Sequence, residues 1–157
     1  GLATRRAFDG ALEAAVGRSA PGGTALILID VDSFKCINDT YGHPVGDDVL
    51  VHLAQVLRSR VRFQDVVLSR LGGDELAVLM PGCASDVAHH RAEDLLEAVR
   101  STPMTLPDGG LLALSISVGV AHMPQDSADR RGLYIAADAA LYAAKRAGRG
   151  RVSVAAS

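Results

Sequence analysis

Apolar positions along the chain follow two different spacings, which together predict a mixture of strands and helices. A continuous apolar run with β-branched members covers residues 25–29 and predicts a strand buried on both faces, near the middle of a sheet. Apolar and small residues alternate strictly over 112–121, which predicts a strand with one buried face. The short run 152–154 predicts an edge strand.

Four other stretches carry apolar residues at helical spacing. We expect helices over 5–16, 46–60, 85–100 and 130–147. Thr4 and Ser85 are suited to cap the first and third of these helices at their N-terminal ends, and Gly148 is suited to end the last one.

Two apolar runs, 66–71 and 76–80, flank the segment Gly72-Gly73-Asp74-Glu75. Two glycines between strands predict a tight hairpin turn, because glycine adopts positive φ without steric cost. Such a turn exposes its backbone to a ligand and places two carboxylates beside it, as a metal-held phosphate site requires. A solvated acidic turn is the alternative interpretation.

The order of these elements favours one α+β domain with a central, mainly antiparallel sheet flanked by helices. A purely parallel, doubly wound sheet fits less well, because strands joined by a tight hairpin are antiparallel. The chain has 157 residues, enough for one domain with its own core, and it opens on Gly1 without a start methionine. We therefore expect residues 1–157 to be a single domain excised from a longer protein.

Composition narrows the classes of partner. The net charge of −2 gives no basic field for nucleic acid, and an aromatic content of 4% without tryptophan argues against stacking platforms for single strands. No apolar run is long enough to cross a membrane, so we expect no membrane contact by this domain. Cys36 and Cys83 have no metal-ligand spacing and are expected to be free thiols in a reducing cytoplasm.

Carboxylates follow the predicted central strand. Asp30 stands where that strand ends, and Asp32 shares its side if the strand continues. If the hairpin lies beside this strand, Asp30 and Asp74 converge, and with a main-chain carbonyl such as that of Val31 they suit Mg²⁺. Alternatively, Asp30 and Asp32 only end a strand and cap a turn.

Polar residues elsewhere suit a nucleotide. An amide and a carboxylate, at Asn38 and Asp47, can together read a purine edge, whereas helix capping is the alternative for Asp47 or Asp48. Lys145 and Arg149 share one helix side if the last turn persists, where they would bind phosphates or complement the helix C-terminus.

Several separated segments, taken together, resemble the GGDEF domain of bacterial diguanylate cyclases over nearly the whole chain. The matching segments lie within 1–8, 30–47, 70–76, 115–120 and 137–149. The resemblance implies a fold like nucleotidyl cyclase and polymerase palm domains. It also implies condensation of two GTP into cyclic di-GMP with loss of pyrophosphate, in a homodimer whose protomers each hold one GTP.

The resemblance also assigns roles residue by residue. It implies metal ligation by Asp30, the Val31 carbonyl and Asp74, with Mg²⁺ as the metal and Mn²⁺ as an alternative. It implies catalytic roles for Asp74, Glu75 and Lys35. The implied substrate-binding residues are Phe34 and Lys35 in the phosphate loop, Gly72 and Gly73 in the turn, Asn38 and Asp47 on guanine, and Lys145 and Arg149 on the β- and γ-phosphates.

Three positions and one spacing depart from the family pattern. Leu76 replaces the usual phenylalanine at a position that strand alternation predicts to be in the core, and Thr4 and Gly150 stand where asparagine is common. Many members carry an Arg-x-x-Asp product-inhibition site, which Arg62 and Asp65 match in composition, with one extra residue before Arg70. A bulge could absorb that residue; a helix-end arginine and a turn aspartate are the alternative.

The leading hypothesis is an active cytoplasmic diguanylate cyclase, whose parent protein is either free or anchored to a membrane. A second is a catalytically weak or inactive GTP-binding module that controls an attached phosphodiesterase or other output domain. A third, a structural dimerisation module, predicts no guanine selectivity.

Overall fold

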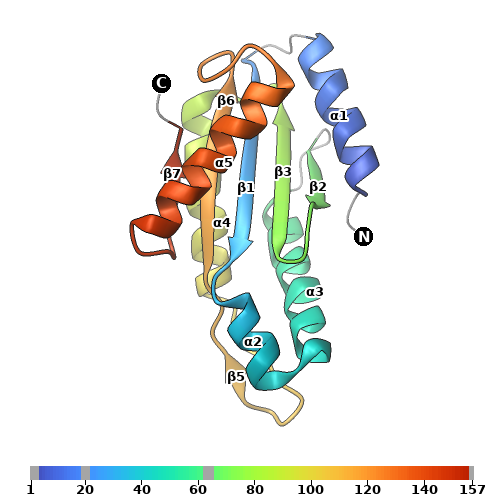
Figure 1. Cartoon of the computed structure of the whole chain (residues 1–157), viewed down its shortest axis with the longest axis vertical. Helices are drawn as coiled ribbons and strands as arrows, with labels where there is room; N and C mark the ends of the chain where they lie inside the picture. Colours follow the sequence, from blue (N-terminus) through green and yellow to red (C-terminus); the bar gives the residue numbers. More distant parts are fainter. Residues whose placement is uncertain (1–3, 19–21, 62–65, 156–157) are drawn as a thin grey trace.

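The computed structural model describes residues 4–18, 22–61 and 66–155. Within them a five-stranded sheet has the order β2-β3-β1-β6-β7, and β4 and β5 form a separate small hairpin (Figure 1). The strands are β1 Thr24–Val31, β2 Val67–Arg70, β3 Glu75–Pro81, β4 Met104–Thr105, β5 Leu111–Leu112, β6 Ile116–Met123 and β7 Val152–Val154. The helices are α1 Arg5–Arg18, α2 Phe34–Tyr41, α3 His43–Arg60, α4 Ser85–Arg100 and α5 Arg130–Arg146.

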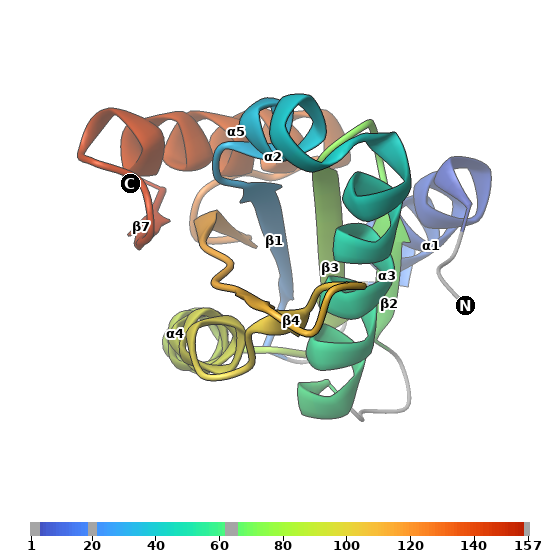
Figure 2. The same cartoon turned by 90° about the horizontal axis from the view of Figure 1, so that it is seen from below.

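The sheet is antiparallel except where β7 runs parallel to β6, so the predicted α+β class and the edge strand are confirmed. Strand β1 lies in the middle and is buried along its whole length, as its apolar run predicts. Helices α5 and α4 lie on opposite sides of β1 (Figure 2). The core therefore has two layers, one between the sheet and α3 and α4, the other between the sheet and α1 and α5.

The alternating segment 112–121 differs from the prediction of one strand with one buried face. It divides into β5 and β6, and β6 is buried on both faces. The reason is visible at Gly119, where an added Cβ would collide with the backbone of Ala137 and Leu141 in α5. Small residues on that face of β6 thus mark the close approach of a helix and not exposure to solvent.

Helix boundaries show further differences. Helix α1 extends to Arg18, and Thr4 caps it as predicted, because its hydroxyl accepts a hydrogen bond from Ala7 N at 3.0 Å. Helix α3 begins at His43, three residues before the predicted start, with Pro44 in its first turn. Ser85 is the first residue of α4 and not its cap, since Ala84 occupies the cap position and makes no side-chain hydrogen bond.

Helix α2 was not anticipated from the sequence. It is only eight residues long and buries Ile37, with Phe34 packed against the core one turn earlier. A pair of apolar residues at a spacing of three is too little to establish a period. The segment expected to be a phosphate loop is therefore the first turn of a helix.

Candidate active site

The carboxylates of the hairpin and the central strand meet at one end of the sheet. Asp30 and Glu75 are direct partners in the β1–β3 register, and Val31 N donates to the main-chain carbonyl of Asp74 at 3.2 Å. Directly opposed residues of an antiparallel pair project from the same face. This is the face that α5 covers, because Leu26 and Leu28, which alternate with Asp30, pack in the α5 layer. The convergence of Asp30 with the hairpin is therefore confirmed.

Asp30 is a buried acid, with 7% of its surface exposed. Burial raises its pKa; Lys145, which forms an ion pair with Asp30 Oδ2, lowers that pKa, and the nearby carboxylate of Asp74 raises it. Its Oδ1 atom is buried and accepts no hydrogen bond from the described residues. A buried oxygen without a donor, beside a second carboxylate, fits a hard divalent cation. Asp30 and Asp74 would supply only two carboxylates to such a cation, since within the described residues no three His, Cys, Asp or Glu side chains cluster as a metal site.

Glu75 has a different environment from Asp30. Tyr134 on α5 donates its hydroxyl hydrogen to Glu75 Oε1 at 3.0 Å. Burial raises the pKa of Glu75, the hydrogen bond from Tyr134 lowers it, and the charges of Asp30 and Asp138 raise it. Tyr134 gave no sequence signal, because a tyrosine in an alanine-rich helix is indistinguishable from a packing residue.

The turn between β2 and β3 is wider than the predicted two-glycine turn. Leu71 N and Gly72 N both donate to Glu75 O, at 2.8 and 3.4 Å, so residues 71–74 form the loop. Neither Gly72 nor Gly73 has positive φ, which corrects that expectation. A Cβ added at either glycine would meet no atom within 4 Å. The glycines therefore leave the backbone of the turn uncovered by side chains. The guanidinium of Arg70 shapes the loop by donating to the carbonyls of Gly72 and Gly73, each at 2.9 Å.

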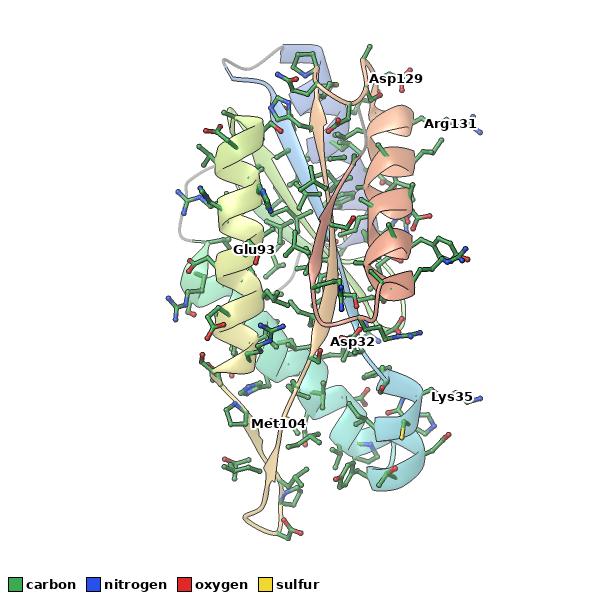
Figure 3. All side chains as sticks on the ribbon, turned by 90° about the vertical axis from the view of Figure 1, so that its left-hand side faces the viewer. Asp32, Lys35, Glu93, Met104, Asp129 and Arg131 are labelled. Atoms are coloured by element: carbon green, nitrogen blue, oxygen red, sulfur yellow. The ribbon has the colours of Figure 1, made fainter. Side chains whose placement is uncertain are left out.

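Asp32 lies on the same side of the sheet as Asp30, as expected, because its carboxylate is bonded by Ser117, the direct partner of Asp30 on β6. Strand β1 ends at Val31, and the chain then turns into α2. Asp32 accepts hydrogen bonds from Ser115 and Ser117 hydroxyls, each at 2.6 Å, and from Gly150 N at 3.0 Å. Figure 3 shows Asp32 at the junction of the central strand with α2. Asp32 thus ties the loop after α5 to the end of β1.

That loop carries Arg149. Helix α5 ends at Arg146, and Arg149 has φ 61°, so Lys145 and Arg149 do not share one helix side as expected. Arg149 N donates to Ala144 O and Gly148 N to Lys145 O, the paired bonds of a glycine-terminated helix, which confirms Gly148 as the stop signal. Gly150 has φ 59°, a conformation that glycine and asparagine both tolerate, which accounts for glycine where the family has asparagine.

The two proposed guanine readers lie on neighbouring helices. Asn38 is on α2 and is partly buried, with Oδ1 buried and without a hydrogen-bond donor among the described residues. Asp47 is exposed within α3 and lines a groove together with Leu50 and Arg70. Capping by Asp47 or Asp48 is excluded, because α3 begins at His43 with Gly42 as its cap. Both residues therefore offer polar groups that the helices do not use.

Two of the remaining expected site residues, Phe34 and Lys35, lie in α2. Phe34 is half-buried and Lys35 exposed in the first turn of α2, and Figure 3 shows Lys35 pointing away from the domain. Leu76 is fully buried in the core, as alternation predicts. Arg62 and Asp65 lie outside the described residues, so the inhibitory site stays a prediction.

The mainly antiparallel five-stranded sheet flanked by helices is that of a nucleotidyl cyclase-like, palm-type domain, with acidic residues at one end of the sheet. The chain matches the family model "Diguanylate cyclase, GGDEF domain" over residues 1–151, and it belongs to that family. It is 39% identical over 151 residues to the diguanylate cyclase TpbB of Pseudomonas aeruginosa, covering 95% of this chain and 34% of the relative. It is 39% identical over 155 residues to the response regulator PleD of Caulobacter vibrioides, covering 97% and 34%.

Solved structures of GGDEF domains have the same fold as this chain. The GGDEF domain of TpbB from P. aeruginosa superposes with a TM-score of 0.92 at 35% identity, covering 99% of this chain and 98% of that one. The GGDEF domain of DgcB from Caulobacter crescentus, in complex with c-di-GMP, gives 0.89 at 35% identity, covering 98% and 91%. The chain thus spans about a third of the full-length curated relatives and nearly all of the isolated domains. No helix among the described residues is long and apolar enough to cross a membrane.

Proposed function

We propose that this chain is a catalytic domain that condenses two GTP into cyclic di-GMP and releases two pyrophosphates. The observation that carries the proposal is the approach of Asp74 and Lys145 to Asp30 at the end of β1, where Glu75 is the register partner of Asp30. Family membership supplies the reaction class. Because GTP is an intracellular substrate, we place the reaction in the cytoplasm.

Asp30, the Val31 carbonyl and Asp74 would hold the divalent cation, for which we propose Mg²⁺, with Mn²⁺ as an alternative. When bound, such a cation neutralises phosphate charge and favours in-line displacement. Lys145 now pairs with Asp30. We expect its ammonium group to turn towards the β- and γ-phosphates when nucleotide binds, because those groups offer more negative charge than one shared carboxylate.

The rest of the site would bind and orient the substrate. Asn38 and Asp47 would read the guanine edge, and the uncovered backbone of Gly72 and Gly73 would lie along the phosphates. Arg149 is presented from a loop that Asp32 and Arg100 hold through the N–H and the carbonyl of Gly150. Lys35, exposed at the start of α2, would approach the phosphates by side-chain rotation.

One domain binds one GTP under this proposal, so the attacking 3′-oxygen comes from the GTP of a second protomer. Transient dimerisation is therefore required for the reaction. The product, cyclic di-GMP, would also be the ligand of an inhibitory site at Arg62 and Asp65.

The test is incubation of concentrated protein with GTP and Mg²⁺, followed by chromatographic identification of the product, with wild type, Asp74→Asn and Asp94→Asn compared. Asp94 is an exposed acid on α4 and serves as the matched control. We expect cyclic di-GMP from wild type and Asp94→Asn, and none from Asp74→Asn. Calorimetry of Mg²⁺-GTP binding should show a loss of at least roughly tenfold, about 1.4 kcal/mol, in Asp74→Asn.

The second candidate function is a GTP-binding module that regulates an attached output domain. Leu76 in place of phenylalanine first suggested it, yet Leu76 is a well-buried core residue and removes no polar group from the site. Tight, guanine-selective binding without any product at high protein concentration would favour this candidate over catalysis. Absence of GTP binding would reject both.

A further inference from the structure

Glu75 is held from two directions. Its main-chain carbonyl accepts hydrogen bonds from Leu71 and Gly72, which fixes the backbone at the start of β3. Its side chain accepts one from the hydroxyl of Tyr134, which lies on α5. The turn therefore fixes the backbone position of Glu75, and the hydrogen bond from α5 orients its carboxylate.

Tyr134 is itself well anchored. Its ring packs partly buried against the α5 layer of the core, next to Leu133, which is fully buried. Tyr142, two turns further along the same helix, is 60% exposed. A phenylalanine would fill the same apolar space as Tyr134, so packing alone gives no reason for the hydroxyl.

The hydroxyl of Tyr134 is suited to be a constant donor. Burial raises its pKa to about 12, and the adjacent carboxylate of Glu75 adds to that rise. It therefore stays protonated across physiological pH and keeps donating. Glu75 needs such a donor, because Asp30 and Asp138 place negative charge nearby and the positive charge of Arg5 has a smaller effect on its pKa.

We propose that Tyr134 is a positioning residue, which by holding Glu75 Oε1 fixes the carboxylate so that Oε2 is directed to the reaction site beside Asp30. This inference rests on the proposed function. Tyr134 acts only through Glu75 and makes no contact with nucleotide. A carboxylate free to rotate would spend part of its time turned away from Asp30, so the loss of the hydroxyl should slow the reaction without weakening the binding of GTP.

The test compares Tyr134→Phe with Tyr142→Phe, which removes the same atom from an exposed site on the same helix. We expect kcat to fall at least roughly tenfold in Tyr134→Phe, as befits one hydrogen bond to a charged group, with an unchanged KM for GTP and a protein that is still folded at the assay temperature. Tyr142→Phe should match wild type. Unchanged kcat in Tyr134→Phe, or a fall in kcat that follows lost thermal stability, would overturn the proposal.

A second readout does not depend on turnover. The carboxyl ¹³C NMR signal of Glu75, assigned with Glu75→Gln, should shift in nucleotide-free Tyr134→Phe and stay in place in Tyr142→Phe. If wild type forms no product, the proposed function fails, and this signal still decides whether Tyr134 holds Glu75. An unshifted signal in Tyr134→Phe would overturn the positioning role even in an active enzyme.

Discussion

Gly46 on α3 leaves the space into which the side-chain amide of Asn38 on α2 fits. A Cβ at Gly46 would fall well inside van der Waals contact with Asn38 Oδ1, and Gly46 is buried. The glycine has ordinary helical geometry, so its role is close approach and not backbone freedom. The two helices, which are joined at Gly42, are thereby packed closely around the side chain of Asn38.

Gly46→Ala should displace Asn38 and lower GTP affinity by at least roughly fivefold, about 1 kcal/mol. The matched control is Gly10→Ala on α1, where an added Cβ meets nothing within 4 Å and alanine should stabilise the helix by up to about 1 kcal/mol. Isothermal calorimetry and thermal melts check both variants. Equal GTP affinity in the two variants would mean that Asn38 does not bind guanine.

Asn38→Ala and Asp47→Ala should each reduce the preference for GTP over ATP. Losing one polar reader of the base should cost about 1–3 kcal/mol of discrimination. Asp48→Ala is the control, because Asp48 is an exposed neighbour on the same helix. Competition binding measures the ratio; if both reader variants keep the wild-type ratio, guanine is read by other residues.

Product formation should rise steeply with protein concentration, because the proposed reaction takes its two nucleotides from two protomers. A leucine zipper fused before Gly1 should raise specific activity in dilute protein by at least roughly tenfold, through higher effective concentration. Activity assays across a dilution series, with sedimentation to report the oligomeric state, check this. Constant specific activity in protein shown to be monomeric contradicts a two-protomer mechanism.

The two free thiols should alkylate at very different rates. Burial raises the pKa of Cys83 above its usual value of 9.0, and the positive charge of Arg91 only partly offsets that rise. Its thiolate therefore appears at higher pH than normal, and iodoacetamide labelling should keep accelerating beyond pH 9. Cys36 is exposed on α2 and should react first at pH 7.5. Mass spectrometry of Cys36→Ser and Cys83→Ser separates the two; faster labelling of Cys83 at neutral pH would contradict the assignment.

Much of the sheet was predictable because burial leaves a direct mark on the sequence. The run 25–29 has no polar residue and lies in the central strand. Asp30, which follows that run, converges with the hairpin. Gly148 marked the end of α5 because the residue after a helix often has positive φ, which glycine adopts readily. The strand run and the helix end depend on residues close together in the chain, whereas the convergence of Asp30 with the hairpin was predicted only if the hairpin lies beside β1.

The missed features depend on contacts between distant segments. The burial of Gly119 follows from α5, whose approach no local spacing reveals. Tyr134 and Glu75 are separated by 59 positions, and Asp32 and Gly150 by 118. The partners of Asp32 could not be read from the strand pattern, because Ser115, Ser117 and Gly150 are all distant from it in the chain. The roles assigned to Lys35, Asn38, Asp47 and Arg149 remain predictions.

The exposed loop 107–110, between β4 and β5, has a consequence for how the chain could be divided. A cut there would leave Asp30, Asp74 and Glu75 on one fragment and Tyr134, Lys145 and Arg149 on the other. Neither fragment would contain a site, and the central strand β1 would lack its neighbour β6 until the two pieces met. Formation of cyclic di-GMP, the product of the proposed reaction, would then require that the two fragments reassemble.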